Sequence, residues 1–346
     1  MTPSRRAALV TAGAAALAAC SRPRPVAPTR SRGLDTRLLD SAFPALAQRA
    51  HPGLFSVGVT DLQSGVIWYW NTDRAFPLQN AFELPLAAAA LAEADAGRLA
   101  LSERLTFSAQ DLSPPFSAIN QKWPTPPDGY SASIPIFTLF TLAVRWGDNT
   151  AADLLMKRIG GPGMVTAWLQ QWPIKDIRID RYEREVLVDL AGLAPFRPAW
   201  KDRPAFVAAR EAIAPARRQG AMYAYLADRR DTATLPAALA LLAKLGAGQL
   251  LSAGSTAVLL AWMQSSFGGE LRLKAGLPAQ VRFAHKAGAA PTDLGFTPVE
   301  NDLGIATWPD GRRFAIAAFL VGSTGARAQR DALFSDAARL IARAVG

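Results

Sequence analysis

Residues 303–320 read LGIATWPDGRRFAIAAFL, and this stretch decides the fold. It holds two β-rich runs, LGIATW and RFAIAAFL, and the Pro-Asp-Gly triplet at 309–311 is typical of a tight turn between strands. Two further β-rich runs near the other end of the chain, LFSVGVT at 54–60 and VIWYW at 66–70, are joined by a Gln-Ser-Gly turn. Strands at both ends predict one antiparallel sheet that both ends of the chain build together.

Helical apolar spacing fills most of the chain between and beside these hairpins. It occurs at 34–50, at 84–96 and at about 331–345, and most of the middle of the chain consists of helical runs with proline and glycine breaks. The fold class is therefore α+β: an antiparallel sheet flanked by helices, with an inserted, mainly helical lobe. The expected boundaries are about 34–75 and 280–346 for the sheet part and about 76–279 for the lobe.

Residues 190–230 stand apart from this helical pattern. They contain Trp200, several prolines and many arginines. We expect a long irregular insertion near an important loop.

The N-terminal segment predicts export. Arg5 and Arg6 precede an apolar run at 7–19, which is too short to span a bilayer but fits the core of a signal peptide. The paired arginines resemble a twin-arginine export signal. Residues 17–20, LAAC, resemble the lipobox of bacterial lipoproteins, in which the cysteine is acylated and becomes the mature N-terminus.

We therefore expect residues 1–19 to be a signal peptide and Cys20 to be lipidated. Residues 20–33, rich in proline and arginine, would form an extended tether to the membrane. The protein would then be an exported, membrane-anchored lipoprotein on the periplasmic or cell-surface side. The alternative is an ordinary cleaved signal with an incidental cysteine.

Composition argues against several classes of function. The chain has one cysteine, two histidines (His51 and His285) and no HExxH run, so we expect neither a disulfide framework nor a metal site. The net charge is +10, but six arginines and no acid lie in residues 1–33, and the remainder holds 32 basic against 28 acidic residues, a balance of +4. That remainder has no basic stripe with interleaved aromatics. We expect no nucleic-acid partner, no cofactor, and a monomer.

Four motifs in the body of the chain carry the chemistry. They are FPLQNAFELPL at 76–86, WGDNTAADLL at 146–155, IKDIRIDRYERE at 174–185 and RFAHKAG at 282–288. In this order they resemble the Ser-x-x-Lys helix, the Ser-Asp-Asn loop, the omega loop and the Lys-Thr-Gly strand of class A serine β-lactamases, within the penicillin-recognising serine hydrolase superfamily. The resemblance covers about 34–346 and implies the β-lactamase fold.

The resemblance also implies a role for each motif position. In the family a serine attacks the lactam carbonyl, a lysine assists removal of its proton, a second serine relays a proton, a glutamate activates water, and a Lys-Thr pair binds the substrate carboxylate. Four of these groups are replaced here: the nucleophile position holds Asn80, the lysine position Glu83, the second serine position Gly147 and the threonine position Ala287. The retained residues are Asp148, Asn149, Glu183 (or, with a short shift, Glu185), Lys286 and Gly288.

A shifted alignment does not restore the missing serine. None of the seven lysines has a serine three residues before it, and the chain has no Gly-x-Ser-x-Gly elbow. An amide is no substitute for a serine alkoxide, and loss of a nucleophile or its base costs several powers of ten in rate. The sequence therefore lacks the serine and lysine that acylation by the family's route requires.

The first hypothesis is a catalytically inactive pseudoenzyme with an altered pocket. Glu83 would project toward Lys286 and Glu183 and pair with Lys286, in place of the lost lysine, because an unpaired buried lysine is costly. The competing explanation is drift, in which any residue that packs is tolerated.

Two other hypotheses remain. The pocket could bind a β-lactam or a peptidoglycan stem without turnover, with Lys286 and Asn149 as the remaining polar contacts. Alternatively the protein is a hydrolase: a β-lactam hydrolase like its family, or one that uses Glu83 and Glu183 as an acid/base carboxylate pair on peptidoglycan sugars.

Overall fold

Both ends of the chain build the central sheet, as the hairpins predicted. The computed structural model describes residues 33–114, 117–119, 130–193, 195–201 and 203–346, so the predicted signal peptide, Cys20 and nearly all of the tether lie outside it. Five antiparallel strands lie in the order β2-β1-β9-β8-β7. They are β1 (Leu54–Asp61), β2 (Ile67–Trp70), β7 (Arg282–Ala289), β8 (Thr297–Thr307) and β9 (Arg313–Ser323).

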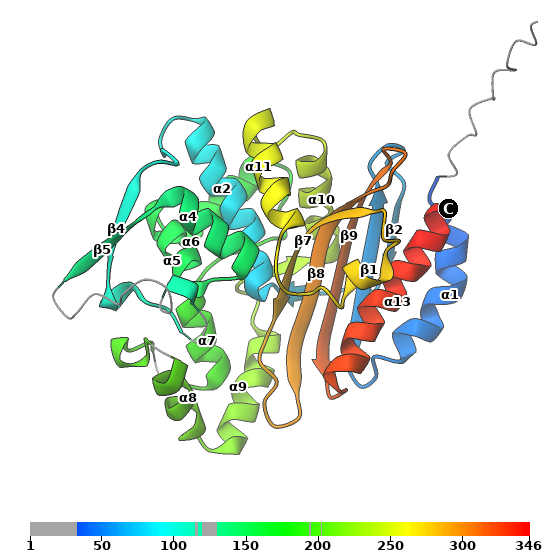
Figure 1. Cartoon of the computed structure of the whole chain (residues 1–346). Coiled ribbons are helices and arrows are strands. Elements are labelled where there is room, and N and C mark those ends of the chain that lie inside the picture. Colours follow the sequence, from blue (N-terminus) through cyan, green and yellow to red (C-terminus); the bar gives the residue numbers. More distant parts are fainter. Residues whose placement is uncertain (1–32, 115–116, 120–129, 194, 202) are drawn as a thin grey trace, which may run out of the picture. The chain divides into compact units, whose positions relative to one another are not determined.

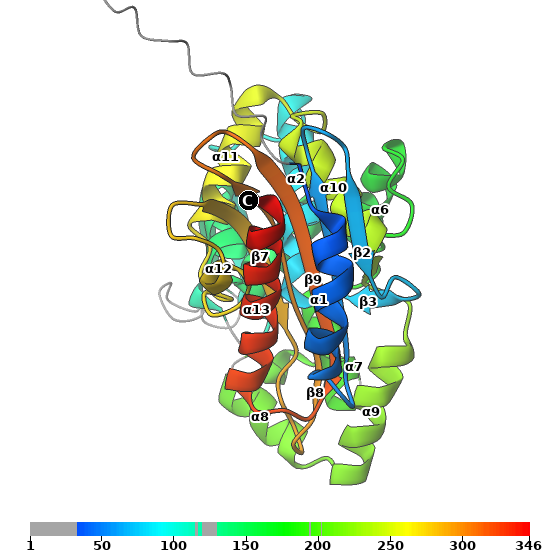
Figure 2. The same ribbon diagram turned by 90° about the vertical axis from the view of Figure 1, so that its right-hand side faces the viewer.

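Helices cover both faces of this sheet (Figures 1 and 2). α1 (Thr36–Gln48) and α13 (Arg327–Val345) lie side by side on one face, and α10 (Leu235–Gly246) packs against the other. Side chains of β9 alternate between the two cores: Ile316 lies in the core beneath α1 and α13, whereas Phe319 lies in the core that contains α10. Because both of its faces are buried, β9 reads as a continuous apolar run.

The residues between the two hairpins form the mainly helical lobe (Figure 1). Its principal helices are α2 (Glu83–Asp95), α4 (Ile136–Phe140), α5 (Asn149–Arg158), α6 (Pro162–Gln171), α7 (Glu183–Ala191), α8 (Arg203–Glu211), α9 (Pro215–Ala227), α11 (Ala253–Gln264) and the short α12 (Leu273–Gly276). Two small ladders pair β3 (Ala75–Pro77) with β6 (Thr232–Thr234), and β4 (Arg104–Ser108) with β5 (Ser131–Pro135). Short helical turns are η1 (Gln79–Phe82), η2 (Ala109–Asp111), η4 (Pro198–Trp200) and the π-helical η3 (Thr141–Trp146).

Helix α2 is the buried axis of the lobe. Every residue from Glu83 to Leu91 is buried, and α2 contacts α5, α6 and α11. A helix that is apolar on all sides belongs in the interior of a large core, which explains the alanine- and leucine-rich sequence. Glu83, the first residue of this buried helix, is therefore placed inside the protein.

The expectation of irregular structure at 190–230 was wrong. The described part of this region consists largely of α8 and α9, whose first turns carry Pro204 and Pro215. Proline at the start of a helix has no amide hydrogen to lose and has the helical φ already set, so these prolines start helices rather than break them. Of the arginines, Arg203 and Arg217 are exposed on these helices, whereas Arg210 and Arg218 are partly buried.

Among the described residues, no helix is both long enough and apolar enough to cross a bilayer.

Close approach of α12 to α13 generates a stability prediction. A Cβ at Gly276 would collide with the backbone oxygen of Ser335 in α13. We expect Gly276→Ala to lower the free energy of unfolding by at least ~1–3 kcal/mol, because backbone has to move to make room. The matched control is Gly220→Ala in α9, where a Cβ meets no atom within 4 Å, and which should gain ~0.5–1 kcal/mol. Urea denaturation of both variants measures this, and equal effects would contradict the packing.

Candidate functional site

Seven of the nine motif positions line one cavity of about 350 Å³. These are Asn80, Gly147, Asn149, Glu183, Lys286, Ala287 and Gly288. The other two, Glu83 and Asp148, lie behind the cavity wall and are fully buried. Residues that are more than 200 positions apart thus meet at the junction of the helical lobe with β7.

Asn80 lies in η1, directly before α2. Its side-chain Nδ2 donates to Glu83 Oε1 at 3.0 Å and to Asn149 Oδ1 at 3.4 Å. The preceding residue, Gln79, has φ of +46°, a left-handed conformation that is strained for any residue except glycine. Gln79 is buried and its side chain donates to the Tyr225 hydroxyl, which helps to hold this conformation. The strained turn therefore presents Asn80 to the cavity.

Glu83 and Lys286 form the ion pair that the sequence hypothesis proposed. Lys286 Nζ lies 2.6 Å from Glu83 Oε2, and the exposed fractions of the two side chains are 2% and 0%. Lys286 Nζ also donates to the Ala143 carbonyl oxygen at 3.3 Å. Burial raises the pKa of Glu83 to about 7, against the opposing effect of Lys286 and of the hydrogen bond from Asn80. The pair joins the first turn of α2 to the middle of β7.

Gly147 ends the π-helical turn η3 with φ of +66°. A Cβ at this position would meet Asn80 Nδ2 at 3.5 Å and Lys286 Nζ at 3.6 Å, which are ordinary contact distances. A serine side chain thus has room at this position, at the cost of a left-handed backbone conformation.

Asp148 has a structural task. It caps α5, its Oδ1 accepts from the Ala151 amide at 2.9 Å and from Ser117 Oγ at 2.8 Å, and its Oδ2 accepts from the Ile119 amide at 2.9 Å. Asn149 follows as the first residue of α5, and its Nδ2 donates to the Pro114 carbonyl oxygen at 2.8 Å. The motif therefore braces the loop before α5 and leaves the Asn149 amide oxygen directed to Asn80.

Glu183, and not Glu185, faces the cavity. Glu183 opens α7, is 2% exposed, and its backbone amide donates to Asp153 Oδ1 at 2.6 Å. Burial raises its pKa well above the ordinary value, and the nearby carboxyls of Asp153 and Glu83 raise it further. Glu185 instead accepts from the Tyr182 amide at 2.9 Å and is exposed. Of the two glutamates that the sequence offered, Glu183 is the one that lines the cavity.

On β7, Gly288 lets the strand approach η1. A Cβ there would lie 2.6 Å from the Leu78 carbonyl oxygen and 2.9 Å from the Ala81 amide nitrogen, so any other residue would push the strand from the turn that carries Asn80. Ala287, beside it, offers the cavity only a methyl group. His285, expected to be a packed side chain, is 0% exposed, with Nδ1 2.8 Å from Asp302 Oδ1.

Three further residues of the cavity wall received no site role from the sequence. Trp146 and Phe267 stack with ring centroids 4.1 Å apart, and both line the cavity. Arg272 donates through Nη1 to the carbonyl oxygens of Gly288 and Asn301, each at 2.9 Å, so it braces β7 and β8. Trp146 is the first residue of the motif at 146–155, which was a usable signal, but Phe267 and Arg272 come from a loop that carries no motif.

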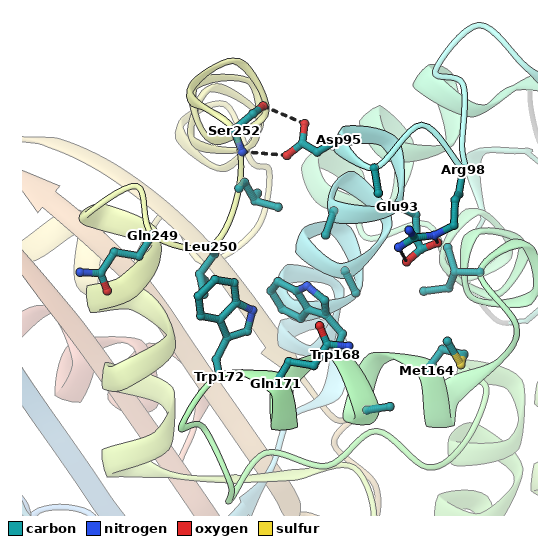
Figure 3. Close-up of a pocket in the computed structure, with 16 residues that line it drawn as sticks. Glu93, Asp95, Arg98, Met164, Trp168, Gln171, Trp172, Gln249, Leu250 and Ser252 are labelled. Carbon is teal, nitrogen blue, oxygen red and sulfur yellow. Dashed lines mark hydrogen bonds and ion pairs between the residues drawn. The ribbon is translucent and has the colours of Figure 1, made fainter.

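A second cavity, of about 450 Å³, lies between α2, α6 and the connection from α10 to α11 (Figure 3). None of the nine motif positions lines it. Its carboxylates have structural partners: Asp95 accepts from the amide and hydroxyl of Ser252, at 2.7 Å each, at the start of α11, and Glu93 binds Arg98 through two bonds. Two indoles line it: Trp168 in α6 and Trp172 directly after that helix. We therefore place the candidate site at the first cavity.

The buried ion pair predicts a large, compensable loss of stability. Glu83→Leu leaves the Lys286 ammonium buried without its carboxylate, and we expect it to lower the free energy of unfolding by ~3–5 kcal/mol. Adding Lys286→Met removes the stranded charge, so the double variant should regain most of that loss. Denaturant unfolding of the two single variants and the double variant gives the coupling energy. Additive losses would contradict a direct pair.

The buried carboxyls predict the pH dependence of stability. Burial raises the pKa of Glu83 to about 7 and that of Asp153 to about 6, and raises that of Glu183 as well. In the unfolded chain such groups lose their protons near pH ~4. The folded protein thus holds more protons between about pH 4.5 and 7, and the free energy of unfolding should fall as pH rises through this range.

Glu183→Gln removes one of these carboxyls, so its free energy of unfolding should fall less steeply with pH. The stability of the variant relative to the unmodified protein should therefore increase as pH rises from 5 to 8. Urea unfolding at four pH values measures the slope. The control is Glu185→Gln, on the exposed side of the same helical turn. An unchanged slope in Glu183→Gln would show that Glu183 does not hold its proton in the folded state.

Comparison with known proteins identifies the family of this chain. Residues 38–345 match the model of a family described as the beta-lactamase enzyme family. The extended-spectrum β-lactamase PER-1 of Pseudomonas aeruginosa is 27% identical over 295 residues, 85% of this chain and 82% of the relative. A β-lactamase of Streptomyces albus G is 27% identical over 349 residues, which cover 99% of this chain and 98% of the relative.

Solved structures agree with the sequence relatives. A β-lactamase from Chitinophaga pinensis superposes with a TM-score of 0.73 at 25% identity, covering 90% of this chain and 100% of that structure. An ancestral class A β-lactamase, that of the last common ancestor of Gram-negative bacteria, gives a TM-score of 0.69 at 30% identity. The match covers 88% of this chain and 99% of that structure. The fold expected from the four motifs is confirmed. The chain belongs to the beta-lactamase enzyme family and has the class A β-lactamase fold.

Proposed function

We propose that this protein is an exported β-lactamase-like pseudoenzyme, which binds a β-lactam or a peptidoglycan stem in its cavity and does not hydrolyse it. The observation that carries the proposal is the hydrogen-bonded centre Asn80–Glu83–Lys286 at the position of the family's nucleophile and base. Its amide, carboxylate and ammonium bind one another at 2.6–3.0 Å.

This centre has no group able to attack a lactam carbonyl. The Asn80 amide nitrogen carries little nucleophilic character, and its hydrogens point to Glu83 and Asn149. Lys286 Nζ is engaged by the Glu83 carboxylate at 2.6 Å and by the Ala143 carbonyl oxygen at 3.3 Å, so it is not placed to take a proton from a nucleophile. A Ser-x-x-Lys pair occurs nowhere in the chain. The formation of an acyl-enzyme lacks both its nucleophile and its base.

The water-activating step has no acyl-enzyme to act on, because this centre has no group that would form one. Burial beside other carboxyls also raises the pKa of Glu183. A Glu83–Glu183 pair on sugars is disfavoured for a different reason, because Glu83 is committed to Lys286 at 2.6 Å.

Binding is supported by what the cavity retains. It keeps about 350 Å³ of space, the amides of Asn80 and Asn149, the Glu183 carboxyl and an aromatic wall. The relatives are β-lactamases by name, so a β-lactam, or the peptidoglycan stem as an alternative ligand, is the class of molecule that we propose for this cavity.

The N-terminal segment supports a proposal for where the protein acts. Residues 1–19 have the charge and length of an export signal, and Cys20 stands at the position where a lipid would be attached. We propose that the protein acts as a membrane-anchored lipoprotein on the periplasmic or cell-surface side, as a monomer.

Intact-protein mass spectrometry after incubation with benzylpenicillin tests the loss of catalysis. The unmodified protein should show no acyl adduct at any time. The variant Asn80→Ser/Glu83→Lys/Gly147→Ser should gain an adduct, because Gly147 has room for a serine and a lysine beside Lys286 has a lowered pKa. The control is Glu83→Lys/Gly147→Ser, which lacks the nucleophile and should remain unmodified. An adduct on the unmodified protein would refute the pseudoenzyme.

A further inference from the structure

We propose that the cavity selects neutral ligands, binding uncharged amides and esters in preference to carboxylates, because Glu83 cancels the charge of Lys286. This inference rests on the proposed function and deepens it by naming the ligand class. It reverses the preference that the resemblance implies, in which a Lys-Thr pair binds the substrate carboxylate.

Lys286 has no charge left to offer an incoming anion. Its Nζ lies 2.6 Å from Glu83 Oε2 and 3.3 Å from the Ala143 carbonyl oxygen, and both charged side chains are at most 2% exposed. A ligand carboxylate at Nζ would bring a second negative group beside Glu83, next to an ion pair that is almost completely buried. Like charges repel strongly there, and the ligand would also lose its hydration.

Arg272, the second cation of the wall, is equally committed. Its Nη1 donates to two carbonyl oxygens, its Nη2 lies 3.2 Å from Glu300 Oε1, and its Nε lies 3.5 Å from Asp331 Oδ1. Arg327 is the remaining cation among the described residues that line the cavity. It is 80% exposed, lies 3.6 Å from Asp331 and is screened by water, so it adds little attraction for an anion.

The loss of Thr and Ser at the motif positions acts in the same direction. Ala287 and Gly147 offer no hydroxyl with which to bind a carboxylate oxygen. The uncharged polar side chains that face the cavity include the amides of Asn80 and Asn149, and the Glu183 carboxyl, whose pKa burial raises, lines it with them. Asn80 Nδ2 donates to Glu83 and to Asn149, and Asn149 Nδ2 donates to the Pro114 carbonyl oxygen. The Asn80 amide oxygen therefore remains to accept from a ligand amide, which suits an uncharged ligand with an amide group.

The aromatic wall fits an uncharged ligand as well. Trp146 and Phe267 stack on each other at the cavity and are both partly exposed, 38% and 47%. They offer apolar surface next to the amides. A ligand with an apolar or aromatic group and an amide backbone would bury this surface without having to desolvate a charge.

The test compares benzylpenicillin with its methyl ester, which differ at the carboxylate, on the full chain at pH 8, above the pKa of Glu83. Binding is followed by isothermal titration calorimetry and by the tryptophan fluorescence that Trp146 contributes to. We expect the ester to bind about tenfold more tightly, the equivalent of ~1.4 kcal/mol. This comparison requires no variant to fold.

Two variants assign the cause. Glu83→Gln keeps the shape and removes the negative charge, so it should raise the affinity for the acid about tenfold and leave the affinity for the ester nearly unchanged. Glu83→Gln/Lys286→Met should lose that gain, because the unmasked ammonium is gone. Glu185→Gln, at an exposed carboxyl two residues beyond Glu183, controls for a general change of charge.

The outcomes separate this inference from the proposed function. If the acid binds as tightly as the ester to the unmodified protein, charge cancellation is refuted while ligand binding stands. If Glu83→Gln folds and gains nothing for the acid, Glu83 is not the cause and the inference fails. If neither compound binds, both the inference and the binding function are refuted, although the absence of acylation is unaffected.

Discussion

The contact between Glu83 and Lys286 joins the helical lobe to the sheet at the candidate site. Glu83 begins the buried helix α2, and Lys286 lies in the middle of β7, so a 2.6 Å ion pair connects the two parts of the fold. A buried charge without a partner is costly. Lys286 has its partner inside the protein, and for this reason we propose that the cavity beside it does not favour anions.

The surroundings of the cavity are ordered in detail. Gln79 adopts a strained left-handed conformation that presents the next residue to the cavity. Gly288 lets β7 pass within contact distance of η1, and Asp148 caps α5 and holds the loop before it. These features position the side chains of the cavity.

Charge neutrality is the property that connects the site to the proposed ligand. The buried cations Lys286 and Arg272 are paired with carboxylates, and burial and acidic neighbours raise the pKa of Glu183. The proposed preference for neutral ligands rests on these paired charges, on the methyl group of Ala287 and on the aromatic surface of Trp146 and Phe267.

The sequence by itself determined the sheet from both chain ends, the lobe between them and the four altered motif positions, because strand alternation, turn residues and motif spacing are local patterns. It also allowed the pairing of Glu83 with Lys286 to be proposed, since the resemblance implies that a glutamate has replaced a lysine close to the retained Lys286. Only the tertiary structure decided that Glu183 faces the cavity while Glu185 caps a helix. It also decided that Arg272 binds β7, β8 and two carboxylates, and that Phe267 stacks on Trp146. It also turned 190–230 from an expected irregular insertion into helices. These contacts join segments that lie far apart along the chain, and side-chain direction and burial there depend on packing that no local pattern contains.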